Sequence, residues 1–151
     1  MVSLKYGSID RRDLEILKIL TKNARIPYSE IGRILGISDV AVIKRIKKLE
    51  QRGIIRGYTI NIDPKKLGFN LISITGIDVE PEFLFTVIEK LKNLENVKYI
   101  AITSGDHAIM TIIWARNSEE ITKLHDEISK LPGVKRVCPA VILDVIKDEK
   151  L

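Results

Sequence analysis

The stretch from Ser29 to Lys48 constrains this 151-residue chain most, because it predicts two helices with almost no chain between them. Apolar residues recur at helical spacing on both sides of the break. Gly36 favours the left-handed conformation that ends a helix, and Ser38 is a good N-cap for the next one. Asp39 then places a negative charge at the positive end of the second helix. The sequence therefore predicts a helix-turn-helix.

The second predicted helix has two faces of different character. Val42, Ile46 and Leu49 follow one another at spacings of four and three residues and form an apolar face. The opposite face is basic and carries Lys44, Arg45, Lys47 and Lys48. A tight helix pair whose second helix is basic on its outer face is typical of DNA-reading proteins. The alternative at this point is an ordinary helix pair with a solvated lysine face.

A recognition helix contacts bases with its N-terminal residues, which here are Asp39, Val40, Ala41 and Lys44. Short apolar side chains suit a thymine methyl group, and a lysine suits the acceptors of guanine. Phosphate contacts are predicted for Arg45, Lys47, Lys48, Arg25 and Arg56, and further backbone contacts for Ser29 and Ser38. The alternatives are core packing for Val40 and a merely solvated charge for Lys47.

The charge of the chain is unevenly distributed. Residues 1–64 hold 13 Lys or Arg and 7 Asp or Glu, whereas residues 65–151 hold 12 and 13. The basic excess therefore lies in the half that contains the helix pair, which favours a module that meets phosphate. Asp63-Pro64 is a turn signal. We predict a DNA-binding domain with its linker over residues 1–64 and a second domain over residues 65–151.

Composition limits the other classes of function. Apolar residues make up 45% and charged residues 30%, and no apolar run approaches the roughly 20 residues that span a membrane. Cys138 is the only cysteine, which fits a reducing cytoplasm. His107 and His125 have no other ligand-type residues at ligand spacing, and His125 is expected at a surface or interface. Without a phosphate-binding glycine loop or a nucleophile elbow, we expect no catalytic site, metal or cofactor.

The remaining pattern predicts an α+β protein with two domains. A first helix begins after Asp10 as its cap, and the alternating residues Ile54–Ile62 predict a strand, so that the N-terminal domain is a winged helix-turn-helix. The second half predicts strands over 71–79, 97–103, 108–115 and 134–146, with helices over 82–94 and 118–131, the latter capped by Ser118. This βαββαβ order is the ferredoxin-like plan.

Two of these strands carry more apolar residues than one covered face requires. In Ile109–Trp114 nearly every residue is apolar, which predicts helices on one face of the sheet and a partner subunit on the other. A helix-turn-helix domain of this size meets one half-site, and its twin must lie about 34 Å away. We expect a homodimer through strands 71–79 and 109–115, and larger assemblies of it.

Taken in order, these motifs resemble the Lrp/AsnC family of transcription regulators, most of all its archaeal members. The residues that carry the resemblance are Ile9-Asp10-x-x-Asp13, Asn23-Ala24-Arg25, Glu30-Ile31-Gly32, Gly36-Ile37-Ser38, Val42, Arg45-Ile46, Leu49-Glu50, Gly53-Ile54-Ile55, Pro64, Leu67-Gly68, Gly105-Asp106-His107 and Leu131-Pro132-Gly133-Val134. The resemblance implies an N-terminal DNA-binding domain. It also implies a C-terminal domain, RAM/ACT-like, that oligomerises and in many members binds an amino acid.

An effector site is predicted at the turn Ser104-Gly105-Asp106-His107, whose backbone N–H groups could hold an α-carboxylate. In the family this turn usually reads Gly-x-aromatic-Asp, but here His107 replaces the aromatic residue and Ala108 the acid. The ammonium group would then need Asp106 or another subunit. The alternative is a plain hairpin turn, for which Gly-Asp is ordinary chemistry.

We therefore predict a cytoplasmic, sequence-specific regulator of transcription that binds double-stranded DNA as a homo-oligomer and responds to an amino acid. Regulation would act by shifting the population among assemblies. One alternative is an architectural protein that coats DNA with little sequence choice and shows a low ratio of specific to non-specific affinity. Another is an enzyme with a ferredoxin-like catalytic domain, which would need a cluster of perturbed acids that residues 65–151 do not contain.

Overall fold

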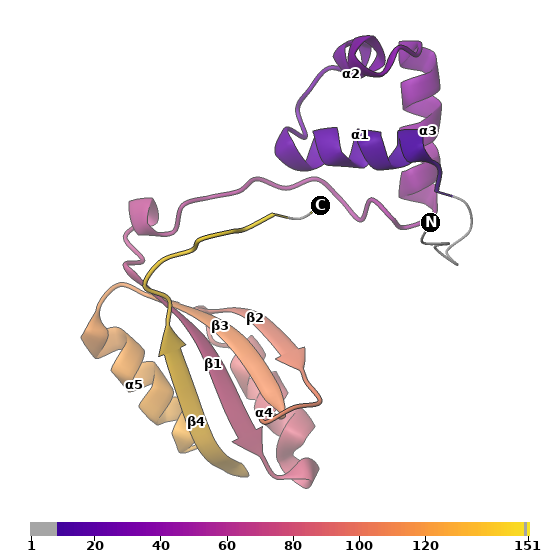
Figure 1. Ribbon diagram of the computed structural model, residues 1–151. Coiled ribbons are helices and arrows are strands. Elements are labelled where there is room, and N and C mark those ends of the chain that lie inside the picture. Colours follow the sequence, from indigo (N-terminus) through magenta and orange to yellow (C-terminus); the bar gives the residue numbers. More distant parts are fainter. Residues whose placement is uncertain (1–8, 150) are drawn as a thin grey trace. The chain divides into compact units, whose positions relative to one another are not determined.

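The computed structural model describes residues 9–149 and 151 (Figure 1). The chain forms two compact units. One runs up to Asn61 and takes in the segment from Lys147 onward, and the other comprises Ile62–Ile146. Among the described residues, no helix combines the length and the apolar character that crossing a membrane requires.

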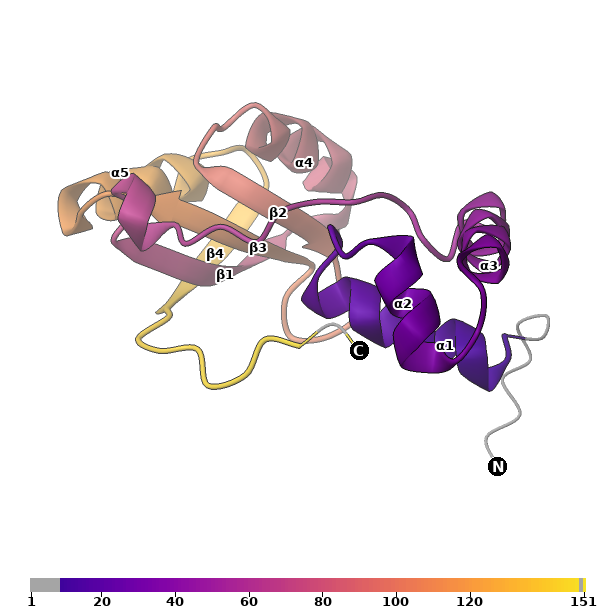
Figure 2. The same ribbon diagram turned by 90° about the horizontal axis from the view of Figure 1, so that it is seen from above.

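The N-terminal unit contains three helices, α1 (Arg11–Lys22), α2 (Tyr28–Leu35) and α3 (Asp39–Gln51) (Figure 2). The predicted cap of the first helix is confirmed, because the Asp10 side chain accepts a hydrogen bond from the Asp13 backbone N–H at 2.9 Å. The Asp13 side chain returns a bond to the Asp10 N–H, so the two form a capping box. All three helices supply the apolar core, which consists of Ile16, Leu20, Ile31, Val42 and Ile46.

The strand predicted over Ile54–Ile62 is wrong. These residues adopt no strand in the chain, and only a short 3₁₀ turn, η1 (Lys65–Leu67), precedes the sheet. Alternation places apolar side chains on one side, but a strand also needs a neighbour to satisfy its backbone N–H and C=O groups. The apolar side is uncovered as well, since Ile60 is 78% exposed. The wing of the predicted domain is therefore absent from the described chain.

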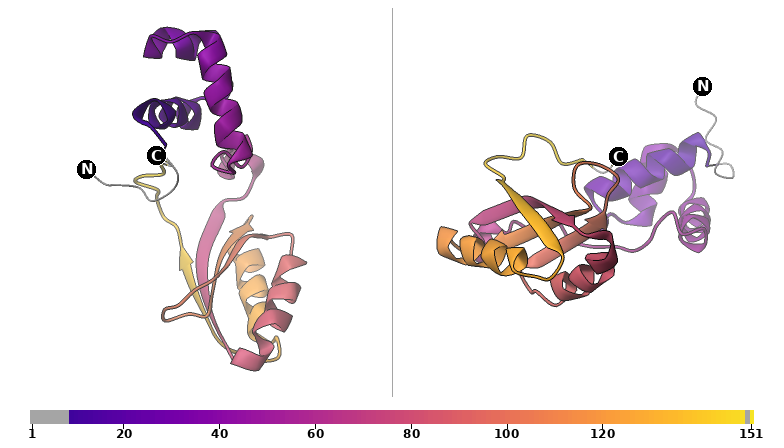
Figure 3. Two further views of the ribbon diagram at one scale, coloured as in Figure 1. Left: turned by 90° about the vertical axis from the view of Figure 1, so that its right-hand side faces the viewer. Right: turned by 90° about the horizontal axis from the view of Figure 1, so that it is seen from below.

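The C-terminal unit has the predicted ferredoxin-like order. Its elements are β1 (Leu71–Val79), the 3₁₀ turn η2 (Pro81–Phe83), α4 (Leu84–Lys92), β2 (Val97–Ile102), β3 (Ile109–Ala115), α5 (Ser118–Ser129) and β4 (Val134–Val141). The strands form an antiparallel sheet in the order β2-β3-β1-β4. Both helices lie on the same face of this sheet (Figure 3).

Two details at the C-terminal end differ from the sequence prediction. Asn117, not Ser118, caps α5, because its side chain accepts a hydrogen bond from the Glu120 N–H at 2.9 Å. Strand β4 ends at Val141, although the apolar run continues to Ile146. Only the part of the apolar run that forms β4 lies opposite β1, where backbone partners are present. The apolar pattern therefore predicted a longer strand than the pairing with β1 supports.

The core of this unit lies between the sheet and its two helices. Ile77, Ile109 and Ile113 are fully buried against α4 and α5. A polar line crosses the same layer, since the Ser73 and Thr75 hydroxyls lie 2.9 Å apart and Thr75 Oγ1 lies 2.9 Å from His125 Nε2. His125 is therefore partly buried and bonded to the sheet, and burial lowers its pKa. The expectation of a surface or interface residue is wrong.

The other face of the sheet, which we call the open sheet face, is apolar but has no helix over it (Figure 3). Its cross-strand pairs are Ile72 with Trp114, Ile74 with Ile112 and Gly76 with Met110. Ile74 is 40% exposed, although it lies in the middle of β1. Because a central strand rarely presents such residues to water, this face has the character of an interface.

Candidate functional site

The turn between α2 and α3 is held by bonds at both helix ends. Gly36 takes the left-handed conformation with φ of 64°, and the Ile37 N–H donates to the Gly32 carbonyl at 3.0 Å. Ser38 then caps α3, since its Oγ accepts a hydrogen bond from the Ala41 N–H at 3.1 Å. The predicted stop and start signals are thus confirmed. They fix α3 immediately after α2.

The N-terminal turn of α3 is exposed along the side away from the core. Val40 is 70% exposed, which excludes the alternative of core packing for this residue. Ala41 is half-buried, whereas Ser29 on α2 and most of the other predicted DNA contacts are exposed: Ser38, Asp39, Lys44, Lys47 and Lys48. The apolar side is buried as predicted, by Val42, Ile46 and Leu49. We call these exposed residues the α3 surface.

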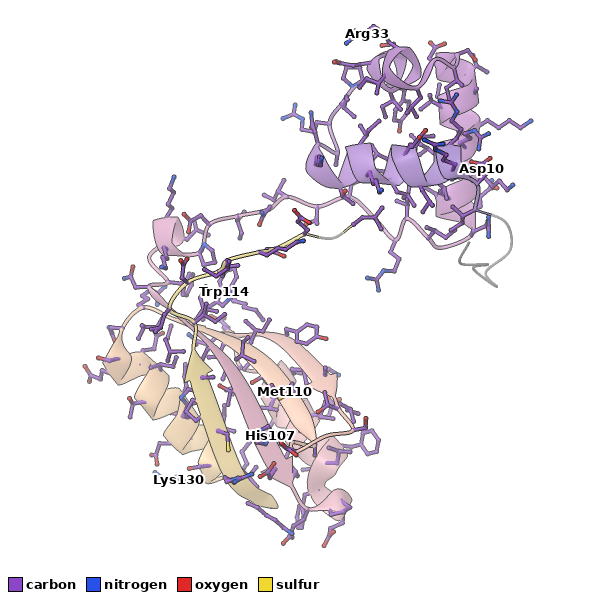
Figure 4. All side chains as sticks on the ribbon, viewed as in Figure 1. Asp10, Arg33, His107, Met110, Trp114 and Lys130 are labelled. Carbon is purple, nitrogen blue, oxygen red and sulfur yellow. The ribbon has the colours of Figure 1, made fainter. Side chains whose placement is uncertain are left out.

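Arg45 lies apart from the other basic residues of α3 and joins α3 to α1. Its Nη1 lies 2.6 Å from Asp10 Oδ2 and 2.7 Å from Asp13 Oδ1, at the start of α1 where Figure 4 labels Asp10. Asp13 is buried, so Arg45 neutralises a carboxylate that has little access to water. This hydrogen bonding by Arg45 lowers the pKa of Asp10. The phosphate contact of Arg45 remains a prediction, and the residue also has this structural role.

Sequence reasoning missed this Arg45–Asp10–Asp13 cluster, because Arg45 lies more than thirty positions from the two aspartates. Asp10 and Asp13 were explained by helix capping alone, and Arg45 by its place among other basic residues. One signal was available. Capping leaves two carboxylates at the start of α1, and the buried one, Asp13, needs a cation.

In the C-terminal unit, the predicted effector turn lies between β2 and β3. Ser104, Gly105 and Asp106 are exposed, whereas His107 folds back onto the open sheet face. The His107 ring occupies the space above Gly76, where an added Cβ would lie 2.1 Å from its Cδ2 atom. Only a glycine in β1 leaves room for the ring. The position of His107 in the turn therefore depends on Gly76 in the sheet.

His107 also has a charged partner on the sheet. Its Nδ1 lies 2.7 Å from Asp78 Oδ1, and Arg136 Nε lies 2.7 Å from Asp78 Oδ2. Hydrogen bonds from His107 and then Arg136 lower the pKa of Asp78. An ionised carboxylate only accepts, so the His107 Nδ1 carries the proton. Asp78, the carboxylate beside the turn, is thus already paired within the chain.

The described residues include no group of three or more His, Cys, Asp or Glu side chains that could hold a metal ion. Cys138 is half-buried and free. The geometry therefore offers two surfaces for function, the α3 surface and the effector turn with the open sheet face beside it.

Comparison with known proteins decides between the classes of function. Residues 9–50 match the AsnC-type helix-turn-helix domain, and residues 71–151 match a C-terminal dimeric alpha+beta barrel domain. The chain belongs to the Lrp/AsnC family of transcriptional regulators. As a member of this family it binds DNA through its helix-turn-helix, has a dimeric C-terminal domain and is not an enzyme.

The similarity to individual Lrp/AsnC members extends over almost the whole chain. The transcriptional regulator LrpA of Pyrococcus horikoshii is 54% identical over 140 residues, which cover 92% of this chain and 99% of LrpA. The structure of Escherichia coli AsnC, 26% identical, covers 95% of this chain and 98% of AsnC with a TM-score of 0.85. A Neisseria meningitidis regulator solved as a complex with L-Met is 18% identical and covers 95% of both chains with a TM-score of 0.86.

The Arg45 cluster gives a prediction about stability. We expect Arg45→Ala to lower the free energy of unfolding of the N-terminal unit by about 2 kcal/mol at pH 7, because it leaves Asp13 buried without its cation; the value is set below that of a fully buried pair since Arg45 is partly exposed. Guanidinium denaturation followed by circular dichroism measures the change. Lys44→Ala, on the exposed side of the same helix, is the control and should alter stability by less than about 0.5 kcal/mol.

The pH dependence separates this ion pair from simple loss of packing. The pKa of Asp10 in the folded chain lies below its unfolded value, so the pair contributes fully at neutral pH. That contribution disappears as the pH falls from about 4 through the lowered pKa. The stability difference between the wild type and Arg45→Ala should therefore shrink in acid. A difference that stays constant down to pH 2.5 would contradict the ion-pair explanation.

Proposed function

We propose that the protein is a sequence-specific regulator that binds double-stranded DNA as a homodimer, with α3 in the major groove of each half-site. The observation that carries this proposal is the exposed N-terminal turn of α3, where Val40 is 70% exposed and takes no part in the hydrophobic core. A side chain of this kind is unfavourable in water and suits a thymine methyl group. Lys44, one turn further along, is exposed beside it.

The proposal divides the α3 surface into two kinds of contact. Asp39, Val40, Ala41 and Lys44 lie in the first part of α3 and meet base edges. The residues that contact phosphates are Lys47, Lys48, Ser29, Ser38, Arg25 and Arg56. Arg45 adds a phosphate contact through the donors that do not bond to Asp10 and Asp13. Base contacts give sequence choice, whereas phosphate contacts give affinity that depends on salt.

Two single variants distinguish these roles. Lys44→Ala should weaken binding to a selected operator by about 1–3 kcal/mol and weaken binding to scrambled DNA less, because a base contact is lost. Lys48→Ala should weaken binding to both DNAs equally. It should also reduce the slope of log K against log salt by about 0.9, because one phosphate contact is lost. Fluorescence anisotropy at several salt concentrations measures both effects.

The matched control for both variants is Lys90→Ala, an exposed lysine on α4 of the other unit, which should leave affinity and slope unchanged. Equal affinity of the wild type for operator and scrambled DNA would support the architectural alternative instead. Unchanged affinity for both DNAs in both variants would remove the α3 surface from the proposal.

We place the dimer contact on the open sheet face. Its support is that apolar residues of β1 and β3 alternate on this face while both helices cover the other, and that the matching family domain is dimeric. Burying Ile72, Ile74, Met110, Ile112 and Trp114 against a second copy would remove them from water. The polar rim would include Asp78 and Arg136.

A charge in the middle of this face should separate the subunits. Ile112→Glu places a carboxylate opposite Ile74, and burying it unpaired costs several kcal/mol, so the dimer constant should weaken by at least about a hundredfold. Light scattering at micromolar concentration measures the mass. Phe85→Glu is the control, because Phe85 is 72% exposed on α4, on the covered side of the sheet. A dimer that survives Ile112→Glu would move the interface elsewhere.

We further propose that a free amino acid binds at the effector turn. Its support is the exposed backbone of Ser104, Gly105 and Asp106, together with the L-Met complex of the Neisseria meningitidis relative. Backbone N–H groups suit the α-carboxylate, and Asp106 is the exposed carboxylate for the ammonium group. Asp78 is less suited to that role, since His107 and Arg136 already occupy both of its oxygens.

Thermal shift with each of the twenty amino acids tests this site. A ligand at one hundred times its dissociation constant adds about 2.7 kcal/mol, which raises Tm by several degrees. Asp106→Asn should abolish the shift, whereas Glu95→Gln, an exposed acid in a different turn, should retain it. The absence of a shift with every amino acid at high concentration would exclude free amino acids as effectors.

A further inference from the structure

The segment of residues 56–62 joins the DNA-reading helices to the sheet unit, and we call it the linker. The last backbone bonds before it run from the Ile54 and Ile55 N–H groups to the Leu49 carbonyl, at 2.9 and 3.2 Å. Within the described residues, no backbone–backbone hydrogen bond involves positions 56–62. Side chains must therefore fix the direction in which the linker leaves α3.

One linker side chain returns to α3. Tyr58 Oη donates a hydrogen bond to Glu50 Oε1 at 2.7 Å, and Glu50 lies in the last turn of α3. Burial and this bond raise the pKa of Tyr58 well above its usual range, and Tyr28 contributes in the same direction. Tyr28 is the first residue of α2. The Tyr58 hydroxyl thus bonds to the end of α3, the second helix of the helix-turn-helix.

We infer that the Tyr58–Glu50 hydrogen bond anchors the linker to the recognition helix and that Tyr58 is a positioning residue for the spacing of half-sites on DNA. The inference rests on the proposed dimeric DNA binding. Each subunit presents one α3, and the linker is the only covalent path from α3 to the sheet unit. If the first residues of the linker are fixed on α3, the recognition helices of the two subunits can adopt fewer distances and orientations relative to each other.

The expected consequence concerns spacing more than affinity. Neighbouring base pairs lie 3.4 Å apart, and a pair of half-sites must match the separation of the two recognition helices, roughly 34 Å. A held linker penalises a site that is one base pair too long or too short. A released linker adapts to such a site, at the cost of ordering more chain when it binds.

The test compares the wild-type dimer with Tyr58→Phe, which keeps the ring and removes the donor. A series of DNAs carries two selected half-sites whose separation changes in steps of one base pair. For the wild type, one separation should bind best. In Tyr58→Phe, the preference for it over its one-base-pair neighbours should fall about fivefold, the equivalent of one exposed hydrogen bond, while affinity for DNA with a single half-site stays unchanged.

Hydrogen exchange of the free protein tests the anchor without DNA. The Ile54 and Ile55 amides, which donate to the Leu49 carbonyl directly before the linker, should exchange about fivefold faster in Tyr58→Phe, because opening this end of α3 no longer breaks the Tyr58–Glu50 hydrogen bond. Thr122→Val is the control, since it removes an exposed hydroxyl from α5 in the other unit, away from the open sheet face, and should change neither measurement. Glu50→Gln keeps an acceptor oxygen and should retain part of the spacing preference.

Unchanged exchange and unchanged spacing preference in Tyr58→Phe would overturn the inference. An equal loss of affinity on every DNA, including the single half-site, would also overturn it, because Tyr58 would then contact DNA or support α3 itself. Failure of the proposed function looks different. The wild type would then bind no DNA selectively, while the exchange experiment would still report on the anchor.

Discussion

Helices cover only one face of the sheet in the C-terminal unit, and the proposed dimer contact depends on that imbalance. Helices α4 and α5 bury Ile77, Ile109 and Ile113, whereas the opposite side of the same strands carries Ile74, Ile112 and Trp114, and no helix of the described residues covers it. Leaving such a surface in water is costly, so in the proposed dimer a second copy would cover it and pair the DNA-reading units at the same time. This proposal links dimerisation and DNA recognition through one sheet.

Polar contacts along α3 hold this helix in place, while the side away from the core remains exposed. Ser38 caps its start, Glu50 near its end accepts from Tyr58, and Arg45 in its middle reaches the two carboxylates at the start of α1. These contacts leave Lys44, Lys47 and Lys48 exposed. A helix that must read bases benefits from being fixed before it binds, because less conformational freedom is then lost on binding.

Local signals predicted the elements well and the long-range contacts poorly. Strand β1 has the bounds expected from its apolar run, and Gly36 and Ser38 end and begin helices as predicted. In contrast, the Ile54–Ile62 strand failed because periodicity does not supply a pairing partner. The Arg45 cluster and the Tyr58–Glu50 bond depend on how the helices pack, which no residue spacing encodes. His125 was misplaced for the same reason, since Thr75 is fifty positions away.

The effector turn shows why a family resemblance does not carry over to every residue. Where the family pattern predicts an acid, this chain has Ala108, and where the pattern predicts an aromatic ring, His107 lies over Gly76 and bonds to Asp78. The aromatic position has thus become part of a charged cluster that includes Arg136. A ligand at this turn would meet a different distribution of charge from the one that the family pattern provides. Its chemistry must follow from Asp106 and this cluster, so the effector of one relative does not identify the effector here.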